Sequence, residues 1–284
     1  MRILITGAGG RLGSELVRAL ASQPHTVIGV DTDTVDVTDQ AAVGEAFAAA
    51  SPELVIHCAA LTAVDFCAEH PDEALRVNGY GTQIVAQTCL QHGAALAYLS
   101  TNEVFDGQEC RPYLEYDPPR PANPYGYSKW VGEQVVRDLV SRHFIIRTSW
   151  LFAHGGRNFI HTVLRRAREG QPLRVVVNEV SSPTYANDLA AAIARLAVTG
   201  NYGIYHLANE GYTSRWQFAR EALDQAGFEA VPIEPIALAE FVRASRPPQY
   251  AILRNTAAAR LGITLRPWQE ALTAFLEAEG LRAR

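Results

Sequence analysis

Three glycines spaced three residues apart follow the first apolar run of the chain. The run 2–6 leads into Gly7, Gly10 and Gly13, and an amphipathic stretch of helical length begins at Arg11. Glycine permits a tight turn and a close backbone approach to a pyrophosphate, and the start of a helix favours negative charge. A strand, a G-x-x-G-x-x-G turn and a helix in this order predict a dinucleotide-binding loop. A plain glycine turn is the alternative.

Apolar runs bounded by glycine, proline and asparagine alternate along the chain with amphipathic stretches of helical length. This alternation predicts an α/β fold with a Rossmann-type, doubly wound parallel sheet. The predicted strands cover residues 2–6, 26–30, 54–58, 96–100, 144–148, 175–177 and 204–208. The predicted helices cover residues 11–22, 40–49, 71–92, 125–140, 158–168, 185–198, 214–226 and 268–278. We expect residues 1–150 to form an NAD(P)-binding domain and residues 151–284 mainly a smaller α/β substrate domain, with the chain near 181–208 returning to the first sheet.

Composition and charge exclude several classes of protein. Charged residues make up 19% of the 284 residues and the formal net charge is -5, which argues against a nucleic-acid-binding surface because phosphate neutralisation needs clustered positive charge. No window approaches the roughly 18 consecutive apolar residues of a membrane span. The four cysteines show neither C-x-x-C spacing nor a disulfide framework, which indicates a reducing compartment. We therefore expect a cytoplasmic protein with no nucleic-acid or membrane partner.

An acidic residue lies where the adenine ribose of a dinucleotide is expected. Asp31 ends the second predicted strand, 18 positions after Gly13, and a carboxylate there commonly accepts hydrogen bonds from the ribose hydroxyls. No arginine or lysine adjoins Asp31 to receive a 2′-phosphate, so we predict that NADH is preferred over NADPH. A solvated acidic loop is the alternative. Four further residues are placed to line adenine and ribose, or simply to pack: Asp36, Val37, Ala59 and Ala60.

The chain contains a single lysine, Lys129, among its 25 basic residues. Tyr125 precedes it by four positions, so on a helix the two side chains share one face. A nearby ammonium stabilises phenolate, and we expect it to lower the pKa of Tyr125 from its ordinary value of about 10. Tyr125 can then donate a proton to a carbonyl oxygen as a hydride arrives. The Thr101 hydroxyl is expected either to lie within reach of the same carbonyl or to cap a turn. Asn78, a poor helix former inside a predicted helix, is predicted to be a buried tether near this site.

These residues resemble the extended short-chain dehydrogenase/reductase superfamily, whose active site joins Ser or Thr to a Tyr-x-x-x-Lys pair. Across nearly the whole chain, the segments 59–65, 100–107, 123–129 and 246–250 are most similar to the dTDP-4-dehydrorhamnose reductase family. The resemblance implies that hydride passes from NADPH or NADH to the C4 ketone of a dTDP-6-deoxy-4-keto-hexose. It assigns the reducing site to Thr101, Tyr125 and Lys129. It assigns dinucleotide binding to Gly7, Gly10, Arg11, Leu12, Gly13, Asp31, Ala59, Ala60 and Thr62.

On the substrate side, the resemblance places Trp150 in the sugar pocket, together with Asn102, Glu103 and the reducing residues. Guanidinium suits phosphate geometry, so Arg246 is our candidate for binding the sugar-nucleotide diphosphate, unless it is an ordinary surface arginine. Trp150 and His154 follow the fifth strand, where their rings could stack on the sugar. We find no spacing typical of metal ligands and expect no metal. The oligomeric state stays open, with a homodimer as one candidate assembly.

The chain departs from the family pattern at two places. The family more often has Thr-Asp-Tyr where this chain has Thr101-Asn102-Glu103, and Asp-Gln-Phe-Gly where it has the residues 178–181. These departures put the identity of the substrate in doubt. The alternatives are another nucleotide-sugar reductase, an epimerase or dehydratase, or a regulatory subunit that binds nucleotide without turnover. The presence of Tyr125 and Lys129 favours catalysis.

Overall fold

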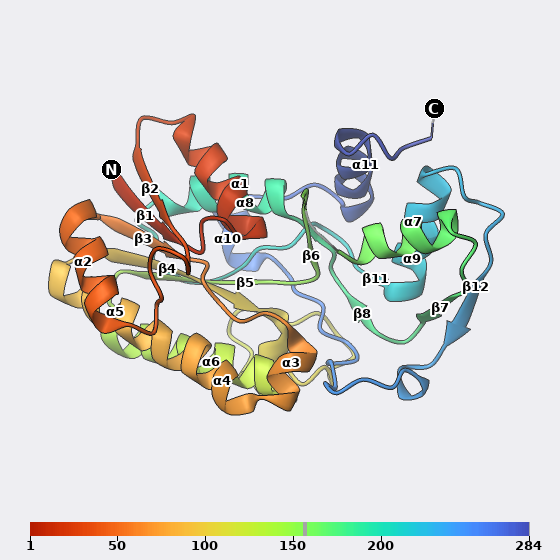
Figure 1. Ribbon diagram of the computed structural model, residues 1–284, viewed down its shortest axis with the longest axis horizontal. Coiled ribbons are helices and arrows are strands. Elements are labelled where there is room, and N and C mark those ends of the chain that lie inside the picture. The colour runs from red at the N-terminus through yellow and green to blue at the C-terminus, as the bar shows by residue number, and fades with distance from the viewer. Residues whose placement is uncertain (156–157, 284) are drawn as a thin grey trace.

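The computed structural model describes residues 1–155 and 158–283. Its centre is a six-stranded sheet with the order β10-β5-β4-β3-β1-β2, in which every pair of neighbours is parallel (Figure 1). The strands are β1 (Arg2–Thr6), β2 (Thr26–Val30), β3 (Leu54–His57), β4 (Ala95–Thr101), β5 (His143–Thr148) and β10 (Gly203–His206). The predicted α/β class and doubly wound parallel sheet are confirmed. The strand order reverses between β1 and β3: β2 is added on one side of β1, and β3, β4, β5 and β10 are added on the other. Such a switch point is where sheets of this kind bind ligands.

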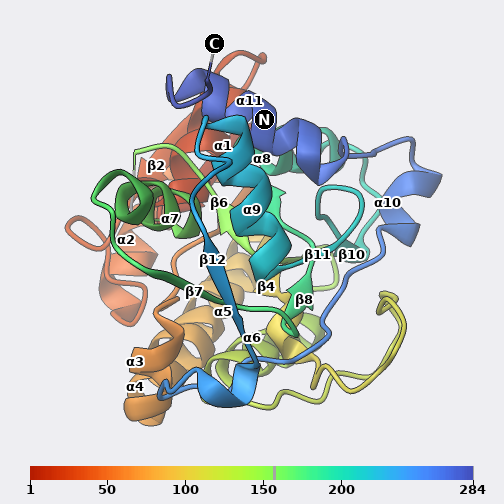
Figure 2. The same cartoon turned by 90° about the vertical axis from the view of Figure 1, so that its right-hand side faces the viewer.

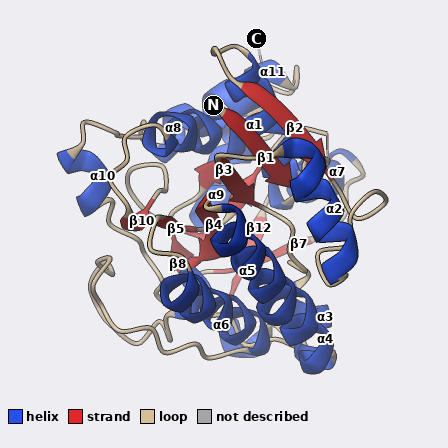
Figure 3. Ribbon diagram, turned by 90° about the vertical axis from the view of Figure 1, so that its left-hand side faces the viewer, coloured by secondary structure: helices blue, strands red, loops and turns tan. Residues whose placement is uncertain are grey.

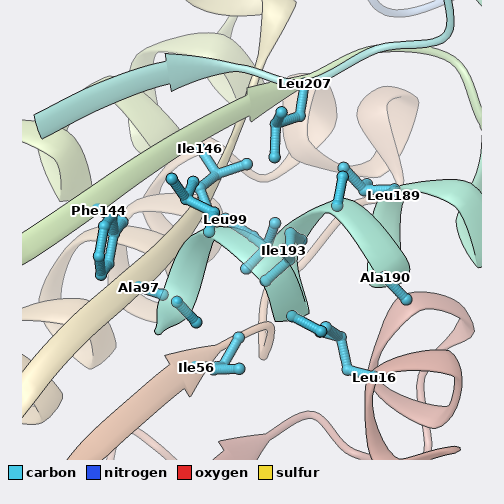
Figure 4. Close-up of a cluster of buried hydrophobic side chains, with 14 of the residues drawn as sticks. Leu16, Ile56, Ala97, Leu99, Phe144, Ile146, Leu189, Ala190, Ile193 and Leu207 are labelled. Atoms are coloured by element: carbon cyan, nitrogen blue, oxygen red, sulfur yellow. The ribbon is translucent and has the colours of Figure 1, made fainter. Parts of the chain in front are cut away.

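Helices cover both faces of this sheet (Figure 3). On one face the apolar side chains of α1 (Arg11–Ala21), α8 (Ala186–Ala197) and α10 (Thr256–Arg260) pack on the strands. Figure 4 shows part of that cluster, with Leu16 of α1 and Ile193 of α8 directed toward Ile56 of β3. The opposite face is covered by α2 (Gln40–Ala50), α5 (Thr82–His92) and α6 (Pro124–Leu139).

A second apolar cluster lies in the C-terminal half of the chain (Figure 2). It is built from α7 (Phe159–Arg168), α9 (Arg215–Gln225) and α11 (Trp268–Ala278), together with the parallel pair β7 (Leu173–Val176) and β12 (Ile233–Ile236). Two short pairs complete this half: β6 (Leu151–Phe152) with β9 (Thr184–Tyr185), and β8 (Val180–Ser181) with β11 (Thr213–Ser214). Between β9 and β11 the chain returns to the large sheet, where α8 packs beside α1 and β10 pairs with β5.

One predicted helix is interrupted. Instead of a single helix over 71–92, the structure has α4 (Pro71–Leu75), a π-helical turn η1 (Arg76–Gly81) and then α5. The side chain of Asn78 bonds across to a loop at this turn, which accounts for the irregular winding that the apolar periodicity did not reveal. The short elements α3 (Val64–Glu69) and η3 (Leu238–Glu240) were also not predicted. None of the described helices is long and apolar enough to cross a membrane.

A fully buried ion pair joins α6 to the sheet. The Arg147 guanidinium donates to both carboxylate oxygens of Glu133, at 2.9 and 2.7 Å, and both side chains are at most 2% exposed. The Ser100 hydroxyl donates to the same carboxylate at 2.5 Å. Charges can be buried at tolerable cost only when they are paired and hydrogen-bonded in this way.

Replacing Glu133 with Gln leaves Arg147 buried without a counter-charge. We expect the free energy of unfolding, measured by urea denaturation, to fall by about 3–5 kcal/mol. The exposed pair Arg165–Glu169 provides the control, because Glu169→Gln should change that free energy by less than about 1 kcal/mol. Similar losses from the two substitutions would contradict a special role for the buried pair.

Candidate active site

The glycine turn between β1 and α1 lies against the end of β3. Gly7 has a φ of +68°, the left-handed conformation that favours glycine. A side chain at Gly7 would lie 2.7 Å from the backbone nitrogen of Ala59, and one at Gly13 would lie 2.1 Å from the Gly7 carbonyl oxygen. Gly10 precedes α1 and supplies no side-chain cap to its N–H groups. The turn therefore presents closely packed backbone and a helix N-terminus at the switch point of the sheet, an arrangement suited to a pyrophosphate.

Asp31 is tied to this turn instead of standing in a solvated loop. One of its carboxylate oxygens accepts from the Gly9 N–H at 2.6 Å, and the other accepts from the Thr32 N–H at 2.7 Å. The carboxylate is thereby held beside the glycine turn at the end of β2. A bound 2′-phosphate at this point would face a negative charge.

The other residues expected to hold a dinucleotide surround the turn in different ways. Arg11 is exposed at the start of α1, whereas the Leu12 side chain is buried in the core, so Leu12 can offer a ligand only its backbone. Ala59 and Ala60 are partly exposed after β3, and Thr62 is exposed close by. These five residues lie on the segments that follow β1 and β3.

Asp36 and Val37 lie on the loop that follows β2. The Asp36 carboxylate accepts from the N–H and the hydroxyl of Thr38, both at 2.9 Å, and these bonds hold the pKa of Asp36 below its ordinary value. Val37 is buried, and one of its methyl groups lies 3.0 Å from the position that a Cβ atom at Gly81 would take. Their contact with a dinucleotide stays a prediction.

The three residues expected to reduce a carbonyl lie near the C-terminal end of β4. Thr101 ends that strand and is buried, and its hydroxyl lies close enough to the side chain of Tyr125, in the first turn of α6, to lower the pKa of the phenol. Lys129 lies one turn further along α6 and is 3% exposed. Its Nζ is 4.3 Å from the centre of the Tyr98 ring. The structure thus brings Thr101 at the end of β4 close to Tyr125 of α6. Lys129 lies one turn further along α6.

Burial changes the proton affinities of this group. It lowers the pKa of Lys129 to about 8, although the Glu133 carboxylate acts in the opposite direction. It raises the pKa of Tyr125 well above 10, and the Glu103 carboxylate raises it further, while the bond with Thr101 lowers it. The prediction that Lys129 lowers the pKa of Tyr125 is therefore wrong in this structure. Burial and the Glu103 carboxylate dominate the shift, and the Lys129 ammonium does not contribute to it.

A buried polar contact supports the first turn of α6 from below. Asn78, in the π-helical turn, accepts from the Leu61 N–H at 2.8 Å and donates to the Ser128 hydroxyl at 2.9 Å. Ser128 in turn donates to the Tyr125 carbonyl oxygen at 2.8 Å. The prediction that Asn78 is a buried tether near the site is confirmed. It links the loop after β3 to the helix that carries Tyr125.

The side chain of Asn102 contacts Thr101, because its amide oxygen accepts from the Thr101 hydroxyl at 3.3 Å. It is 4% exposed, and its amide donates to the Ser181 hydroxyl and to the Ala251 carbonyl oxygen, both at 3.1 Å. The side chain therefore ties the end of β4 to the C-terminal half. The contact of Asn102 with substrate stays a prediction.

Glu103 belongs to the 3-10 turn η2 (Asn102–Val104) and is partly buried. Its carboxylate accepts from the Asn123 amide at 2.7 Å. Burial raises the pKa of Glu103 to about 6, the bond from Asn123 lowers it, and the carboxylate of Glu179 raises it again. An acid with this pKa changes charge within the physiological pH range.

Trp150 adopts a strained backbone conformation, with a φ of +40°. Such outliers cost of order 1–3 kcal/mol and gather at functional sites. The Arg215 guanidinium carbon lies 3.5 Å from the centre of the indole ring, and Arg215 also donates to Glu179 at 3.2 Å. Arg215 and Glu179 were not among the predicted site residues, because nothing in their local sequence distinguishes them from surface charges.

His154 has partners in the C-terminal half, and its contact with a sugar stays a prediction. Its two ring nitrogens are paired with Glu279 and with the Tyr185 hydroxyl, and its ring stacks on Phe275 of α11. These partners lie 31 to 125 residues away in the sequence, and neither local periodicity nor motif spacing could reveal them.

A cavity of about 830 Å³ is lined by the segments 106–110 and 238–250, together with Asn178. Its polar lining includes Gln108, Asn178, Arg243, Arg246 and Gln249. Arg246 is exposed, and its carbonyl oxygen accepts from the Asn123 amide at 3.2 Å, which joins the cavity to the start of α6.

Arg243 was missed by the sequence analysis. It donates to Asp65 of α3 at 2.8 Å, and the Ser245 N–H donates to the same oxygen at 3.0 Å. This tie spans 178 residues of sequence. It holds the loop that lines the cavity against α3, in the N-terminal half of the chain.

Comparison with known proteins identifies the family. Residues 1–280 match the model described as RmlD substrate binding domain. The chain belongs to this family. Relatives within it include the spore coat polysaccharide biosynthesis protein SpsK of Bacillus subtilis, 38% identical over 97% of each chain. The dTDP-4-dehydrorhamnose reductase of Streptomyces griseus is 37% identical over 96% of this chain and 92% of its own. The crystal structure of the Bacillus anthracis dTDP-4-dehydrorhamnose reductase in complex with NADP has a TM-score of 0.94, with 36% identity over 98% and 99% of the two chains.

Within this RmlD-family chain, the close packing of the glycine turn can be tested on two helical glycines. Gly13→Ala places a methyl group against the Gly7 carbonyl oxygen, and we expect it to lower the free energy of unfolding by about 1–3 kcal/mol. Gly44 lies in α2 with nothing within 4 Å of its side-chain position. Gly44→Ala should therefore raise that free energy by about 0.5–1 kcal/mol. Equal effects in thermal or urea unfolding would show that the turn has room to relax.

Proposed function

We propose that the chain is an NAD(P)H-dependent reductase that acts on the C4 ketone of a dTDP-6-deoxy-4-keto-hexose and converts dTDP-4-dehydro-L-rhamnose to dTDP-L-rhamnose. The observation that carries this proposal is the contact of Thr101 with Tyr125, above Lys129, at the sheet edge that also holds the glycine turn. Relatives that are 36–37% identical over nearly the whole chain carry the name of this reductase.

The glycine turn fits the pyrophosphate of a dinucleotide. Side chains at Gly7 or Gly13 would strike backbone atoms, and the Gly10 end of α1 has no side-chain cap, so the backbone there is shaped for a close anionic ligand. When bound, the reduced nicotinamide supplies the hydride. Asp31 would accept the ribose hydroxyls, and its fixed carboxylate supports a preference for NADH.

The chain's own residues supply the proton. Tyr125 remains protonated at neutral pH because burial raises its pKa, so the phenol carries the proton that the reduction requires. The Thr101 hydroxyl lies near the phenol and offers a second polar contact to the substrate oxygen. The pKa of Lys129 lies near 8, so its ammonium is largely charged at neutral pH and stabilises the phenolate that the transfer leaves behind.

The sugar nucleotide would lie between Trp150 and the cavity beside Arg246. Arg246 and Arg243 line that cavity, and two guanidinium groups match a diphosphate in charge and geometry. The pairing of Arg243 with Asp65 already neutralises part of its charge, so Arg246 is the stronger candidate for the diphosphate. Glu103 lies between this cavity and Tyr125.

A dehydratase is not supported by the polar residues after β4. That reaction needs an acid and a base beside the sugar, but the amide of Asn102 carries no ionisable proton and faces Ser181 and Ala251. Reduction of a different 4-keto sugar nucleotide is the second candidate, because the chain has Glu103 where the family more often has tyrosine.

The proposal is tested by Tyr125→Phe. We expect kcat for oxidation of reduced dinucleotide, with dTDP-4-keto-6-deoxyglucose and a 3,5-epimerase present, to fall at least about a hundredfold, while the dinucleotide Kd is unchanged. Tyr127→Phe is the matched control, since Tyr127 is exposed two residues further along α6. Dinucleotide binding without any oxidation by the unaltered chain would favour a regulatory subunit. Parallel losses of binding and turnover in Tyr125→Phe would indicate a structural role.

The cofactor preference is tested at Asp31. Replacement by Asn keeps an acceptor for the Gly9 N–H and removes the charge that would repel a 2′-phosphate. We expect kcat/KM with NADPH, relative to NADH, to rise by about tenfold, the effect of roughly 1.4 kcal/mol of repulsion. Asp33→Asn, two residues on, should change the ratio less. A tenfold preference of the unaltered chain for NADPH would contradict this assignment.

A further inference from the structure

Glu103 places a carboxylate against the turn of helix that carries Tyr125. The carboxylate accepts from the Asn123 amide at 2.7 Å, and Asn123 is the N-cap of α6, whose side-chain oxygen accepts from the Gly126 N–H at 2.8 Å. A side chain at Gly126 would lie 2.0 Å from the Glu103 carbonyl oxygen and 3.4 Å from its Cβ. Tyr125 stands between Asn123 and Gly126 in the chain. Glu103 therefore contacts α6 at Asn123 and at Gly126, on either side of Tyr125 in the chain. These contacts hold Glu103 against the turn that carries the phenol.

Charged groups face Glu103 from several other elements. Glu179, just before β8, repels its charge, whereas Arg243 of the cavity loop and Arg215 of α9 attract it. Cys67 of α3 and Tyr125 of α6 both have their pKa raised by the Glu103 charge. Burial outweighs the two arginines and the bond from Asn123, so the pKa of Glu103 lies near 6.

We infer that Glu103 is a positioning residue that sets how readily Tyr125 gives up its proton to the sugar ketone, and that reduction is fastest when Glu103 is uncharged. This inference rests on the proposed function and assigns to Glu103 a role in the pH dependence of that reaction.

The chemistry explains the direction of the effect. Hydride from the reduced dinucleotide forms the C–H bond at C4 while the phenol O–H bond breaks and the new alcohol O–H bond forms. The dinucleotide is oxidised, the ketone is reduced, and Tyr125 is left as a phenolate. An anionic Glu103 beside that phenolate destabilises it, whereas a protonated Glu103 does not. The rate of reduction should therefore fall as the pH rises through the titration of Glu103.

Lys129 provides a second, separable titration. Its ammonium stabilises the phenolate and is lost as the pH rises past about 8. The pH profile of kcat should thus fall in two steps, near 6 from Glu103 and near 8 from Lys129. Only the lower step belongs to this inference.

The test compares kcat between pH 5 and pH 9 for the unaltered chain, Glu103→Gln and Glu179→Gln, with the reduced dinucleotide and the keto-sugar nucleotide both saturating. In Glu103→Gln the lower step should disappear, so that the ratio of kcat at pH 7 to kcat at pH 5 rises by up to about tenfold, the effect of one pKa unit. In Glu179→Gln the lower step should persist but move to lower pH, because a neighbouring negative charge has been removed. Glu234→Gln, at an exposed carboxylate of β12, should leave the profile unchanged.

A carboxyl ¹³C NMR titration gives a readout independent of turnover. It should show a resonance that titrates near pH 6 and is absent in Glu103→Gln. Superimposable pH profiles of the unaltered chain and Glu103→Gln, with both turning over, would overturn the inference and leave the proposed function intact. If Glu103→Gln does not fold, an unmoved lower step in Glu179→Gln would overturn it. Absence of reduction by the unaltered chain at every pH would instead overturn the proposed function itself.

Discussion

The geometry of the candidate site depends on the buried ion pair between Arg147 and Glu133. In the sheet register, Arg147 of β5 lies opposite Ser100 of β4 and opposite His206 of β10. Glu133 accepts from both Arg147 and Ser100, so its carboxylate must stand over these two strands at the level of their last residues. A displacement of α6 along its axis would leave buried charges without partners, at a cost of several kcal/mol. The helix therefore has one well-defined position on the sheet.

That position brings the reducing residues together. Glu133 lies one turn after Lys129 and two turns after Tyr125 on the same face of α6, and Thr101 directly follows Ser100. Fixing Glu133 against Ser100 thus places Tyr125 at Thr101. The same carboxylate also offsets part of the burial penalty on the Lys129 ammonium. A group with a structural role thereby keeps the chain's single lysine charged close to neutral pH.

The parts of this arrangement that the sequence could predict are those fixed by local pattern. The apolar alternation placed the strands of the large sheet within one or two residues, and the i, i+4 spacing placed Tyr125 and Lys129 on one helix face. The direction of the Tyr125 pKa shift could not be predicted, because it depends on burial and on Glu103, which meets α6 only after folding. The long-range partners of Asn102 and His154 could not be predicted for the same reason, since they lie far away in the chain. The Arg243–Asp65 pair was missed because either residue alone reads as an ordinary surface charge.

The loop between β12 and α10, which lines the cavity, is positioned by two separate apolar cores. On its N-terminal side, β12 pairs with β7 beside the C-terminal cluster, and on its C-terminal side, α10 and the residues after it pack on the large sheet. Between these anchors, two residues of the N-terminal half bind the loop: Asp65 accepts from Arg243, and the Asn123 amide donates to the Arg246 carbonyl oxygen. Because the diphosphate candidates sit on this loop and the proton donor sits on α6, the distance between them is set by the packing of both cores. Changes in the core of either half should therefore alter the fit of a sugar nucleotide without touching a residue of the site.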